Sequence, residues 1–341
     1  MARKTRRDTV ADLDDLTDEI DDISSRPLRY GGTSDIYQGT WFQDAGCLKA
    51  CRTTKVALKV IRPVNPKDVR AQCRRLRREI SVWKSLNHPN LHQLYGVYEG
   101  LSPLPALVSQ WYARGDINRY LGTMRDGPDL GRIKLKLILE VAQAVEYLHG
   151  KKIVHGDIKG ANVLISDEGN ARLSDFGLSV LLAESSQSLT RTSNVHGTYR
   201  WMAPELVLEE GARHSYASDV WAFGCLIIEV QSGQVPYHSK ANYPQVVAAL
   251  AKFEPPEIPK SDSACLSTVM TGCLIFNAHE RPSPSHIISH IKPSNLKGNW
   301  GFISLFVPKY FRSRNPESTS AKPVQKSAVR SAGALQFRVP T

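Results

Sequence analysis

The fold of this chain is decided by the stretch His155-Gly156-Asp157-Ile158-Lys159-Gly160-Ala161-Asn162 and by Asp175-Phe176-Gly177, which follows soon after it. The first stretch is a short polar segment that carries a carboxylate, an ammonium and an amide. Apolar residues flank it, and they predict two short buried strands at 153–154 and 163–165. We therefore expect a polar loop fixed between two strands of the core.

The side chains of this loop suit the transfer of a phosphoryl group. A carboxylate such as Asp157 can orient a hydroxyl and accept its proton. Lys159 can neutralise charge on a phosphate, while Asn162 and Asp175 can both bind a hard cation through oxygen. Catalysis of phosphoryl transfer consists mainly of positioning and charge neutralisation. The alternative interpretation is a tight strand-turn-strand whose polar residues share no role.

Composition describes an ordinary globular protein. The 341 residues are 41% hydrophobic and 23% charged, which is typical of a soluble chain long enough for one large two-lobed domain or two ordinary ones. No apolar run approaches the roughly 18 residues of a membrane span, and the first residues lack the apolar core of a secretory signal. Paired CxxC spacing is absent, so we expect reduced thiols and a cytoplasmic location, with the nucleus as the alternative; the cysteines are Cys47, Cys51, Cys73, Cys225, Cys265 and Cys273.

The two ends of the chain differ in charge. Residues 1–26 form an acidic leader in which Val10, Leu13, Leu16, Ile20 and Ile23 recur at helical spacing. Two interpretations of the leader stay open: a short amphipathic helix, or a flexible segment whose last residues join the first strand. Residues 293–341 form a basic tail, rich in Ser, Ala, Lys and Pro towards its end, that we expect to be partly disordered.

The net charge of +11 raises the question of an anionic partner. No stacking platform of interleaved aromatic residues accompanies the basic residues, so no nucleic-acid partner is expected. Residues 299–314 do mix aromatic and cationic side chains, which is found in segments at membrane surfaces. Packing of this segment against the rest of the protein is the interpretation that we favour over peripheral membrane contact.

Between the two ends, residues 27–61 predict three short strands with a turn at Gly31-Gly32. The last strand, 56–61, places Lys59 in an apolar run, and an unpaired buried ammonium is costly, so Lys59 needs an anionic partner. A helix predicted over 68–86 carries Glu79, which we favour as that partner over a solvated surface role. Further strands at 91–98 and 106–109 are followed by a helix over 133–149.

These features, in this order, resemble the eukaryotic protein kinase domain over residues 27–292. Details are most similar to the tyrosine-kinase-like group, which includes Raf-like and mixed-lineage-like kinases. Lys159 and the Gly197-Thr198 pair indicate Ser/Thr specificity. The resemblance is carried by Lys59, Glu79, the loop 155–162, Asp175-Phe176-Gly177, the segment 197–205, Asp219 with the apolar helix after it, and Arg281.

The resemblance implies an α+β, two-lobed fold. A small antiparallel lobe of five strands and one main helix, about residues 27–112, would lie over a larger and mainly helical lobe, about residues 113–292, with ATP in the cleft between them. It also implies a signalling enzyme that transfers the γ-phosphoryl group of Mg-ATP to Ser or Thr of protein substrates. The alternative is a pseudokinase scaffold that binds nucleotide weakly, but the full set of charged residues argues against it.

Site roles follow from the same resemblance. Asp157 and Lys159 would be catalytic, and Asn162 and Asp175 would hold Mg²⁺. Ser109 would gate the pocket behind adenine. Structural roles are implied for a Glu205–Arg281 pair and for Asp219, which would anchor the backbone of the 155–162 loop. The implied nucleotide-binding residues are Gly31, Ile36, Ala57, Lys59, Glu79, Gln110, Tyr112, Asp116 (at the ribose) and Leu164.

The sequence departs from the family pattern at several positions. Arg29, Gly31 and Ser34 occupy the three glycine positions of the loop over the phosphates, so only the middle glycine is present. We expect the Arg29 side chain to point to solvent. Gly156 replaces the usual Arg before the catalytic Asp, and Gly160 is taken as ordinary variation. The polar residues 185–193 are expected to be an activation segment with phosphorylatable hydroxyls.

Overall fold

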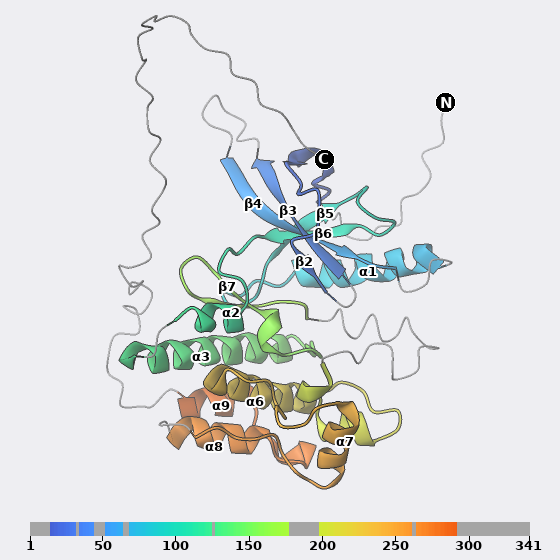
Figure 1. Cartoon of the computed structure of the whole chain (residues 1–341). Coiled ribbons are helices and arrows are strands. Elements are labelled where there is room, and N and C mark those ends of the chain that lie inside the picture. The colour runs from blue at the N-terminus through green and yellow to red at the C-terminus, as the bar shows by residue number, and fades with distance from the viewer. Residues whose placement is uncertain are drawn as a thin grey trace, which may run out of the picture. The chain divides into compact units, whose positions relative to one another are not determined.

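A computed structural model of the chain describes residues 14–31, 34–43, 52–63, 68–124, 127–176, 198–260 and 264–291. These residues form a lobe built on a β-sheet and a lobe built from helices, which confirms the α+β fold expected from the sequence (Figure 1). The predicted activation segment at 185–193 and the tail from 293 lie outside the described residues. Within the described ranges, no helix combines the length and hydrophobicity needed to span a bilayer.

The small lobe is a six-stranded antiparallel sheet, one strand more than expected. Strand order is β1-β3-β4-β6-β5, with β2 paired to β3. The long hairpin of β3 and β4 forms its centre, and one helix, α1 (Val69–Lys84), accompanies the sheet. The strands are β1 (Ile20–Asp21), β2 (Arg29–Tyr30), β3 (Ser34–Gln43), β4 (Arg52–Ile61), β5 (Leu94–Tyr98) and β6 (Ala106–Gln110).

Alternation along β4 gives the sheet two different faces. Val56, Leu58 and Val60 are buried in a cluster that includes Leu16 and Ile20 from the N-terminal segment. Residues between them on the strand are less buried and face the other side. A second cluster is lined by apolar residues of α1, namely Leu76, Ile80 and Trp83. The sheet is therefore covered by the N-terminal segment as well as by α1.

The described end of the leader, residues 14–23, is part of this sheet. The N–H of Leu16 donates to the carbonyl of Val97 at 2.9 Å, and the N–H of Val97 donates to the carbonyl of Asp14 at 2.9 Å. Among the described residues before β1, the helical structure consists of one short 3-10 turn, η1 (Thr17–Glu19). Of the two interpretations of the leader, the strand interpretation is right for these residues, because Leu16 and Ile20 are buried by pairing with the sheet and not by a helical face.

The large lobe consists mainly of helices below a two-stranded sheet (Figure 1). Its central helix, α6 (Tyr216–Ser232), begins at a capping box formed by Ser215 and Ser218 and ends at Gly233, whose φ of 70° lies in the left-handed region. The other elements are α2 (Ile117–Gly122), α3 (Pro128–Gly150), η3 (Gly160–Asn162), β7 (Val163–Ile165), β8 (Ala171–Leu173), η4 (Thr198–Trp201), α5 (Pro204–Leu208), α7 (Tyr243–Ala251), α8 (Ala264–Cys273), η5 (Ala278–Glu280) and α9 (Pro284–Ile291).

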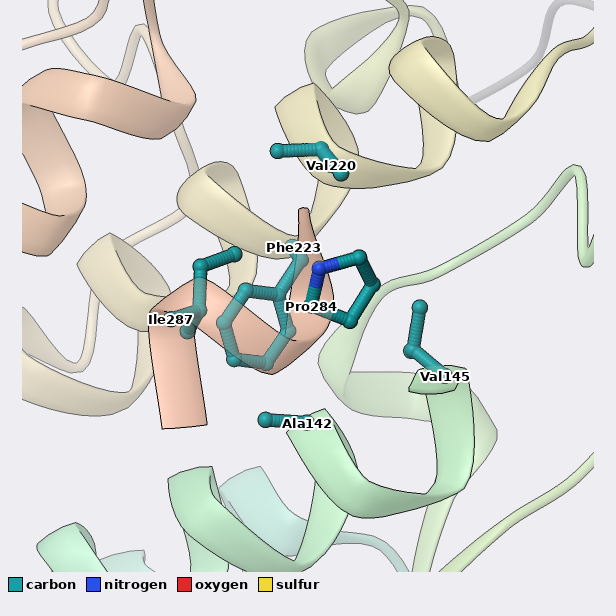
Figure 2. Close-up of a pocket in the computed structure, with 6 residues that line it drawn as sticks. All are labelled: Ala142, Val145, Val220, Phe223, Pro284 and Ile287. Carbon is teal, nitrogen blue, oxygen red and sulfur yellow. The ribbon is translucent and has the colours of Figure 1, made fainter. Parts of the chain in front are cut away.

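Helix α6 is buried on all sides from residue 218 to residue 230. A helix enclosed in this way belongs to the centre of a lobe, and α6 packs there against α3 and α8. Side chains of α3, α6 and α9 converge on one narrow space, which is lined by Ala142, Val145, Val220, Phe223, Pro284 and Ile287 (Figure 2). Because this lining offers no polar group to orient a ligand, the space is part of the hydrophobic core.

Two further features of the large lobe agree with the sequence analysis. Both terminal nitrogens of Arg281 donate to the two carboxylate oxygens of Glu205 at 2.7 Å, so the expected structural pair is confirmed. The guanidinium also donates to the carbonyl of Ala217 at 2.9 Å, which ties this pair to the start of α6. Four cysteines lie in the described ranges, and all are free thiols: Cys73, Cys225, Cys265 and Cys273.

The small and large lobes are joined by backbone pairing as well as by the connection after β6. The N–H of Leu173 donates to the carbonyl of Asn90 at 2.8 Å, and the N–H of His92 donates to the carbonyl of Leu173 at 2.9 Å. Leu173 ends β8, directly before Ser174 and Asp175. This pairing therefore sets the position of Asp175 relative to the small lobe.

Contact between the N-terminal segment and β5 predicts the effect of a glycine substitution. A Cβ added to Gly96 would lie 2.2 Å from the carbonyl oxygen of Asp14, so the backbone would have to move. We expect Gly96→Ala to lower the free energy of unfolding by about 1–3 kcal/mol, as overpacking does. Chemical denaturation measures this value.

A matched control is Gly131→Ala on α3, where a Cβ would meet no atom within 4 Å. That change should be neutral or should stabilise the protein by about 0.5–1 kcal/mol, because alanine is the better helix former. Equal stability of the Gly96→Ala protein and the parent would show that the N-terminal segment does not rest on β5.

Candidate active site

The 155–162 loop is held by a buried carboxylate on α6. Asp219 accepts the N–H of His155 at 2.8 Å through Oδ2 and the N–H of Gly156 at 2.9 Å through Oδ1. The ring nitrogen Nε2 of His149 lies 2.9 Å from Oδ2 and completes the set of donors. Only 1% of the Asp219 side chain is exposed. The anchoring role expected for Asp219 is confirmed.

Glycine at position 156 fits this anchoring. Its φ is 77°, in the left-handed region where a side chain is strained. That conformation accompanies the presentation of successive N–H groups of His155 and Gly156 to one carboxylate. The backbone conformation at position 156 thus favours glycine, which also lacks the guanidinium of the Arg found there in the pattern that the sequence resembles.

His155 links the two acidic residues of the site. It is fully buried, and its Nε2 lies 3.0 Å from the carbonyl oxygen of Ser174. Because a carbonyl only accepts, Nε2 carries the proton, and Nδ1 accepts the N–H of Asp157 at 3.1 Å. Burial lowers the pKa of His155 and outweighs the nearby carboxylates, which raise it. The neutral ring therefore fixes the backbone of Asp157 and of the residue before Asp175.

Three predicted site residues of the loop meet at the carboxylate of Asp157. Lys159 Nζ lies 2.7 Å from Oδ2 of Asp157, and Asn162 Nδ2 donates to the same oxygen at 2.8 Å. Lys159 also donates to the hydroxyl of Thr198 at 3.0 Å. Thr198 belongs to the pair that indicated Ser/Thr specificity, and its neighbour Gly197 lies outside the described residues. The loop thus presents a carboxylate and an ammonium next to a hydroxyl group of the protein itself.

Asp175 is joined to both lobes. Its φ is 63°, and the N–H of Ser174 before it donates to the carbonyl of Asn162 at 2.8 Å. From β4 of the small lobe, Lys59 Nζ lies 2.6 Å from Oδ1 of Asp175. Burial alone would raise the pKa of Asp175, but the charge and hydrogen bond of Lys59 lower it below 3.8. Lys59 therefore has the anionic partner that its place in an apolar strand requires.

The partner favoured for Lys59 in the sequence analysis was Glu79. Glu79 lies on α1, but its side chain is outside the described part of the structure. The ion pair that the structure does describe for Lys59 is the one with Asp175. The Lys59–Glu79 pair stays a prediction.

The chemistry of Asn162 and Asp175 fits a hard divalent cation. Asn162 uses its Nδ2 to bond Asp157, which leaves its Oδ1 without a hydrogen bond from the described residues. Asp175 pairs with Lys59 through Oδ1, and Oδ2 has no such partner among the same residues. Amide and carboxylate oxygens are the donors that Mg²⁺ prefers. The two residues therefore suit the role that the sequence analysis gave them.

A second buried carboxylate, Glu229, holds the far end of the loop, and the sequence analysis missed it. Glu229 Oε2 accepts the N–H of Gly160 at 2.8 Å and the indole N–H of Trp201 at 3.0 Å, while Oε1 accepts from Asn118. Burial raises the pKa of Glu229 despite these hydrogen bonds. An acidic residue inside an otherwise apolar helix was the signal that could have revealed it.

Gly160, which the sequence analysis took as ordinary variation, lies where the loop comes close to side chains of α2 and α6. A Cβ at this position would lie 2.4 Å from Nδ2 of Asn118 and 2.7 Å from Oε1 of Glu229. A hydrogen bond joins these two side chains, so a residue with a Cβ at position 160 would require both of them to shift. Glycine therefore allows the close approach of the loop backbone to α6.

The predicted adenine residues lie on neighbouring strands. Ala57 on β4 is the register partner of Ser109 on β6, and Val56 is the partner of Gln110. Ser109 is buried, and its place behind adenine stays a prediction. The phenol of Tyr95 donates to Oε1 of Gln110 at 3.2 Å, so this side chain is directed back towards β5. The backbone after β6 is therefore the part of this segment available to a ligand.

Other predicted nucleotide-binding residues come from both lobes. Ile36 on β3 pairs with Lys59, and Leu164 on β7 forms a bridge with Asp116. Tyr112 packs its ring 5.4 Å from that of His92, and burial raises the pKa of Tyr112 to about 12. Its side chain thus belongs to the wall of the site and stays uncharged.

Gly31 closes the turn between β2 and β3. Its N–H donates to the carbonyl of Ser34 at 2.7 Å, and a Cβ would lie 2.9 Å from that oxygen. Residues 32 and 33 between them lie outside the described ranges. The middle glycine of the motif is thus needed for the turn itself, and Ser34 is buried at its base.

Arg29 is exposed, as expected, and it also forms an ion pair that the sequence analysis did not anticipate. Its Nη1 lies 3.2 Å from Oδ2 of Asp116, so the guanidinium reaches across from the small lobe to the large one. Asp116 was predicted to meet a ribose. The structure gives it two protein partners, because its Oδ1 also accepts the N–H of Arg119 at 2.9 Å.

The Lys59–Asp175 pair predicts a measurable pKa change. In the parent, ionised Asp175 contributes stability above its ordinary pKa of 3.8, and this contribution is lost as pH falls through the lower folded-state pKa. Lys59→Met removes the charge that lowers this pKa, so burial should then raise the pKa of Asp175 above 3.8. NMR titration of the labelled carboxyl carbon measures it.

Lys55→Met is the matched control, because Lys55 lies on the same strand but donates to Thr40 at 2.7 Å. Its removal should leave the pKa of Asp175 unchanged. If the pKa of Asp175 stays below 3.8 in the Lys59→Met protein, the proposed cause of the shift is wrong.

Residues 24–291 match the sequence model of the family described as "Protein tyrosine and serine/threonine kinase". The chain is 30% identical over 264 residues to the mitogen-activated protein kinase kinase kinase ANP1 of Arabidopsis thaliana, which covers 76% of this chain and 38% of ANP1.

Two further relatives illustrate the range. The serine/threonine/tyrosine-protein kinase HT1 of Arabidopsis thaliana is 28% identical over 286 residues, covering 83% of this chain and 67% of HT1. MAP3K epsilon protein kinase 1 of Brassica napus is 31% identical over 212 residues, covering 62% of this chain and 16% of that protein. The chain thus spans well under half of the length of ANP1 and MAP3K epsilon, and about two thirds of HT1.

Proposed function

By its match over residues 24–291, the chain belongs to the family of protein tyrosine and serine/threonine kinases, and we propose that it transfers the γ-phosphoryl group of ATP to Ser or Thr hydroxyls of protein substrates. The observation that carries this proposal is the carboxylate of Asp157, with Lys159 at 2.7 Å and Asn162 at 2.8 Å. All of the charged residues that the chemistry needs are present, so an enzyme is favoured over a scaffold that only binds nucleotide.

Asp157 is the residue that receives the substrate hydroxyl. Its carboxylate orients the hydroxyl and accepts its proton as the bond to phosphorus forms. The oxygens of Asp157 are held by Lys159 and Asn162, which fixes the direction of attack. The ammonium of Lys159 also offsets charge that develops on the transferred group.

The phosphates are held from both lobes. Lys59 supplies a cation on the small-lobe side, close enough to Asp175 that both act in one site. Asn162 and Asp175 are the residues that would hold Mg²⁺, which when bound neutralises charge on the phosphate oxygens. The loop at Gly31 brings the backbone close to the phosphates, since no Cβ intervenes there.

The nucleoside is placed by residues that lie between these groups and the connection after β6. Ile36, Ala57 and Leu164 provide apolar contacts to the adenine ring. The backbone of Gln110 and Tyr112 offers hydrogen-bonding groups to its edge. Asp116 accepts from the ribose.

Specificity for Ser and Thr is supported by the hydrogen bond between Lys159 and Thr198 at 3.0 Å, because these residues belong to the two motifs that indicated it. Because similar proteins include mitogen-activated protein kinase kinase kinases, we propose that the chain acts in a signalling cascade. The name of HT1 includes tyrosine as well as serine and threonine, so the phosphorylated residue has to be identified directly.

Replacement of Asp157 tests the mechanism. Asp157→Asn keeps the shape and can still accept from Lys159, but it cannot take a proton. We expect kcat to fall by at least about 100-fold while the affinity for ATP changes by less than about threefold. Radiolabelled ATP with phosphoamino-acid analysis measures both the rate and the product.

Asp167→Asn is the control, because Asp167 lies exposed in the turn between β7 and β8. Activity of the Asp157→Asn protein equal to that of the parent would contradict the role of Asp157. Phosphotyrosine as the sole product would contradict the proposed specificity.

A further inference from the structure

An ion pair crosses the side of the site where the ribose is expected. Arg29 lies on β2, and Asp116 lies directly before α2 in the large lobe. Nη1 of Arg29 is 3.2 Å from Oδ2 of Asp116, with 42% of the Arg29 side chain and 17% of the Asp116 side chain exposed. The guanidinium therefore covers part of the acceptor that the proposed function assigns to the ribose.

Both oxygens of Asp116 already have a donor. Oδ1 caps α2 by accepting the N–H of Arg119 at 2.9 Å, and Oδ2 accepts from Arg29. Backbone pairing of Asp116 with Leu164 fixes the residue, as does the hydrogen bond from the N–H of Ile165 to the carbonyl of Gly115 at 2.9 Å. Asp116 is thus held in place, and Oδ2 is the oxygen that a ligand can compete for without uncapping the helix.

The residue before Asp116 makes room for the guanidinium. Gly115 has a φ of 75°, and a Cβ there would lie 2.7 Å from Nη2 of Arg29. The planar group thus rests against bare backbone next to the carboxylate that it pairs with. Glycine at position 115 therefore accommodates the guanidinium of Arg29, and the partial exposure of the Arg29 side chain allows it to move away from Asp116.

We propose that Arg29 competes with the ribose of the nucleotide for Oδ2 of Asp116, and so sets the affinity of the site for the nucleoside. This inference rests on the proposed function. A hydrogen bond between two charged groups is stronger than one from a neutral hydroxyl, so replacing the guanidinium by a ribose hydroxyl reduces the net gain from binding. Exposed ion pairs contribute little, so the reduction amounts to about two- to fivefold in affinity.

The competition has a signature in salt dependence. Salt screens the Arg29–Asp116 pair because it is partly exposed. Adenosine is uncharged, so salt affects its binding mainly by weakening the Arg29–Asp116 ion pair that adenosine has to break. Raising the salt concentration should therefore strengthen the binding of adenosine to the parent protein. The same change should have little effect once Arg29 is removed.

Calorimetric titration of the full chain with adenosine tests the inference at low and high salt. Adenosine is used because it lacks the phosphates that would attract the displaced guanidinium. Arg29→Gln is the test variant. Arg119→Gln is the matched control, because it removes a cation from the same region. Arg119 bonds Asp116 through its backbone N–H, which the substitution keeps. The ligand control is 2′,3′-dideoxyadenosine, which lacks the 2′ and 3′ hydroxyls that adenosine could donate to Asp116.

We expect Arg29→Gln to bind adenosine about two- to fivefold more tightly than the parent at low salt, with the difference vanishing at high salt. Arg119→Gln should bind adenosine like the parent, and dideoxyadenosine should bind the parent and Arg29→Gln equally. Equal or weaker binding of adenosine by Arg29→Gln would overturn the competition alone. If adenosine binds none of the proteins, the proposed nucleotide site itself is wrong, and this inference falls with it.

Discussion

The rest of the site depends on the hydrogen bonds that the buried carboxylate of Asp219 accepts from the backbone of the 155–162 loop. A charge in the interior is stable only with good partners, and Asp219 has two backbone N–H groups and the ring of His149. Those N–H groups belong to His155 and Gly156, from which the chain reaches Asp157. The position of the reacting carboxylate is therefore set from the core of the large lobe and not by the loop itself.

Helix α6 holds this loop at both of its ends. Asp219 near its start fixes the first residues of the loop, and Glu229 near its end fixes the N–H of Gly160. The helix is buried between these residues, so neither carboxylate can move without disturbing the lobe. The ring of His155 is hydrogen-bonded to the carbonyl of Ser174, and this bond also fixes the backbone next to Asp175. One helix thus positions the groups that receive the hydroxyl and those that hold the metal.

Much of the fold could be predicted because the motifs that decide it are local. The polar loop, Lys59 in its apolar strand and the helix over 68–86 each follow from spacing, and the helix is observed as Val69–Lys84. The Glu205–Arg281 pair and the anchor at Asp219 could be predicted because the resemblance supplied long-range partners. For contacts that the resemblance did not imply, most of the distant partners could not be identified from the sequence.

The missed features are contacts between distant residues with ordinary local patterns. The leader residues Leu16 and Ile20 have a spacing that suits a helix, yet the uncovered face of the sheet buries them instead. Arg29 and Asp116 are each polar residues near the surface, and nothing in either segment indicates that they meet. Glu229 is the exception, since an acidic residue within an apolar helix already requires a buried partner.

The anchoring role of Asp219 is tested most directly by amide hydrogen exchange in Asp219→Asn. An amide side chain has only one acceptor oxygen, so one of the two backbone N–H groups would face another donor. The account predicts that the amides of His155 and Gly156 exchange at least about tenfold faster while those of β3 and β4 do not change, and that the free energy of unfolding falls by about 3 kcal/mol. Unchanged exchange at His155 and Gly156, with unchanged stability, would show that the loop holds its own conformation and that Asp219 does not position the site.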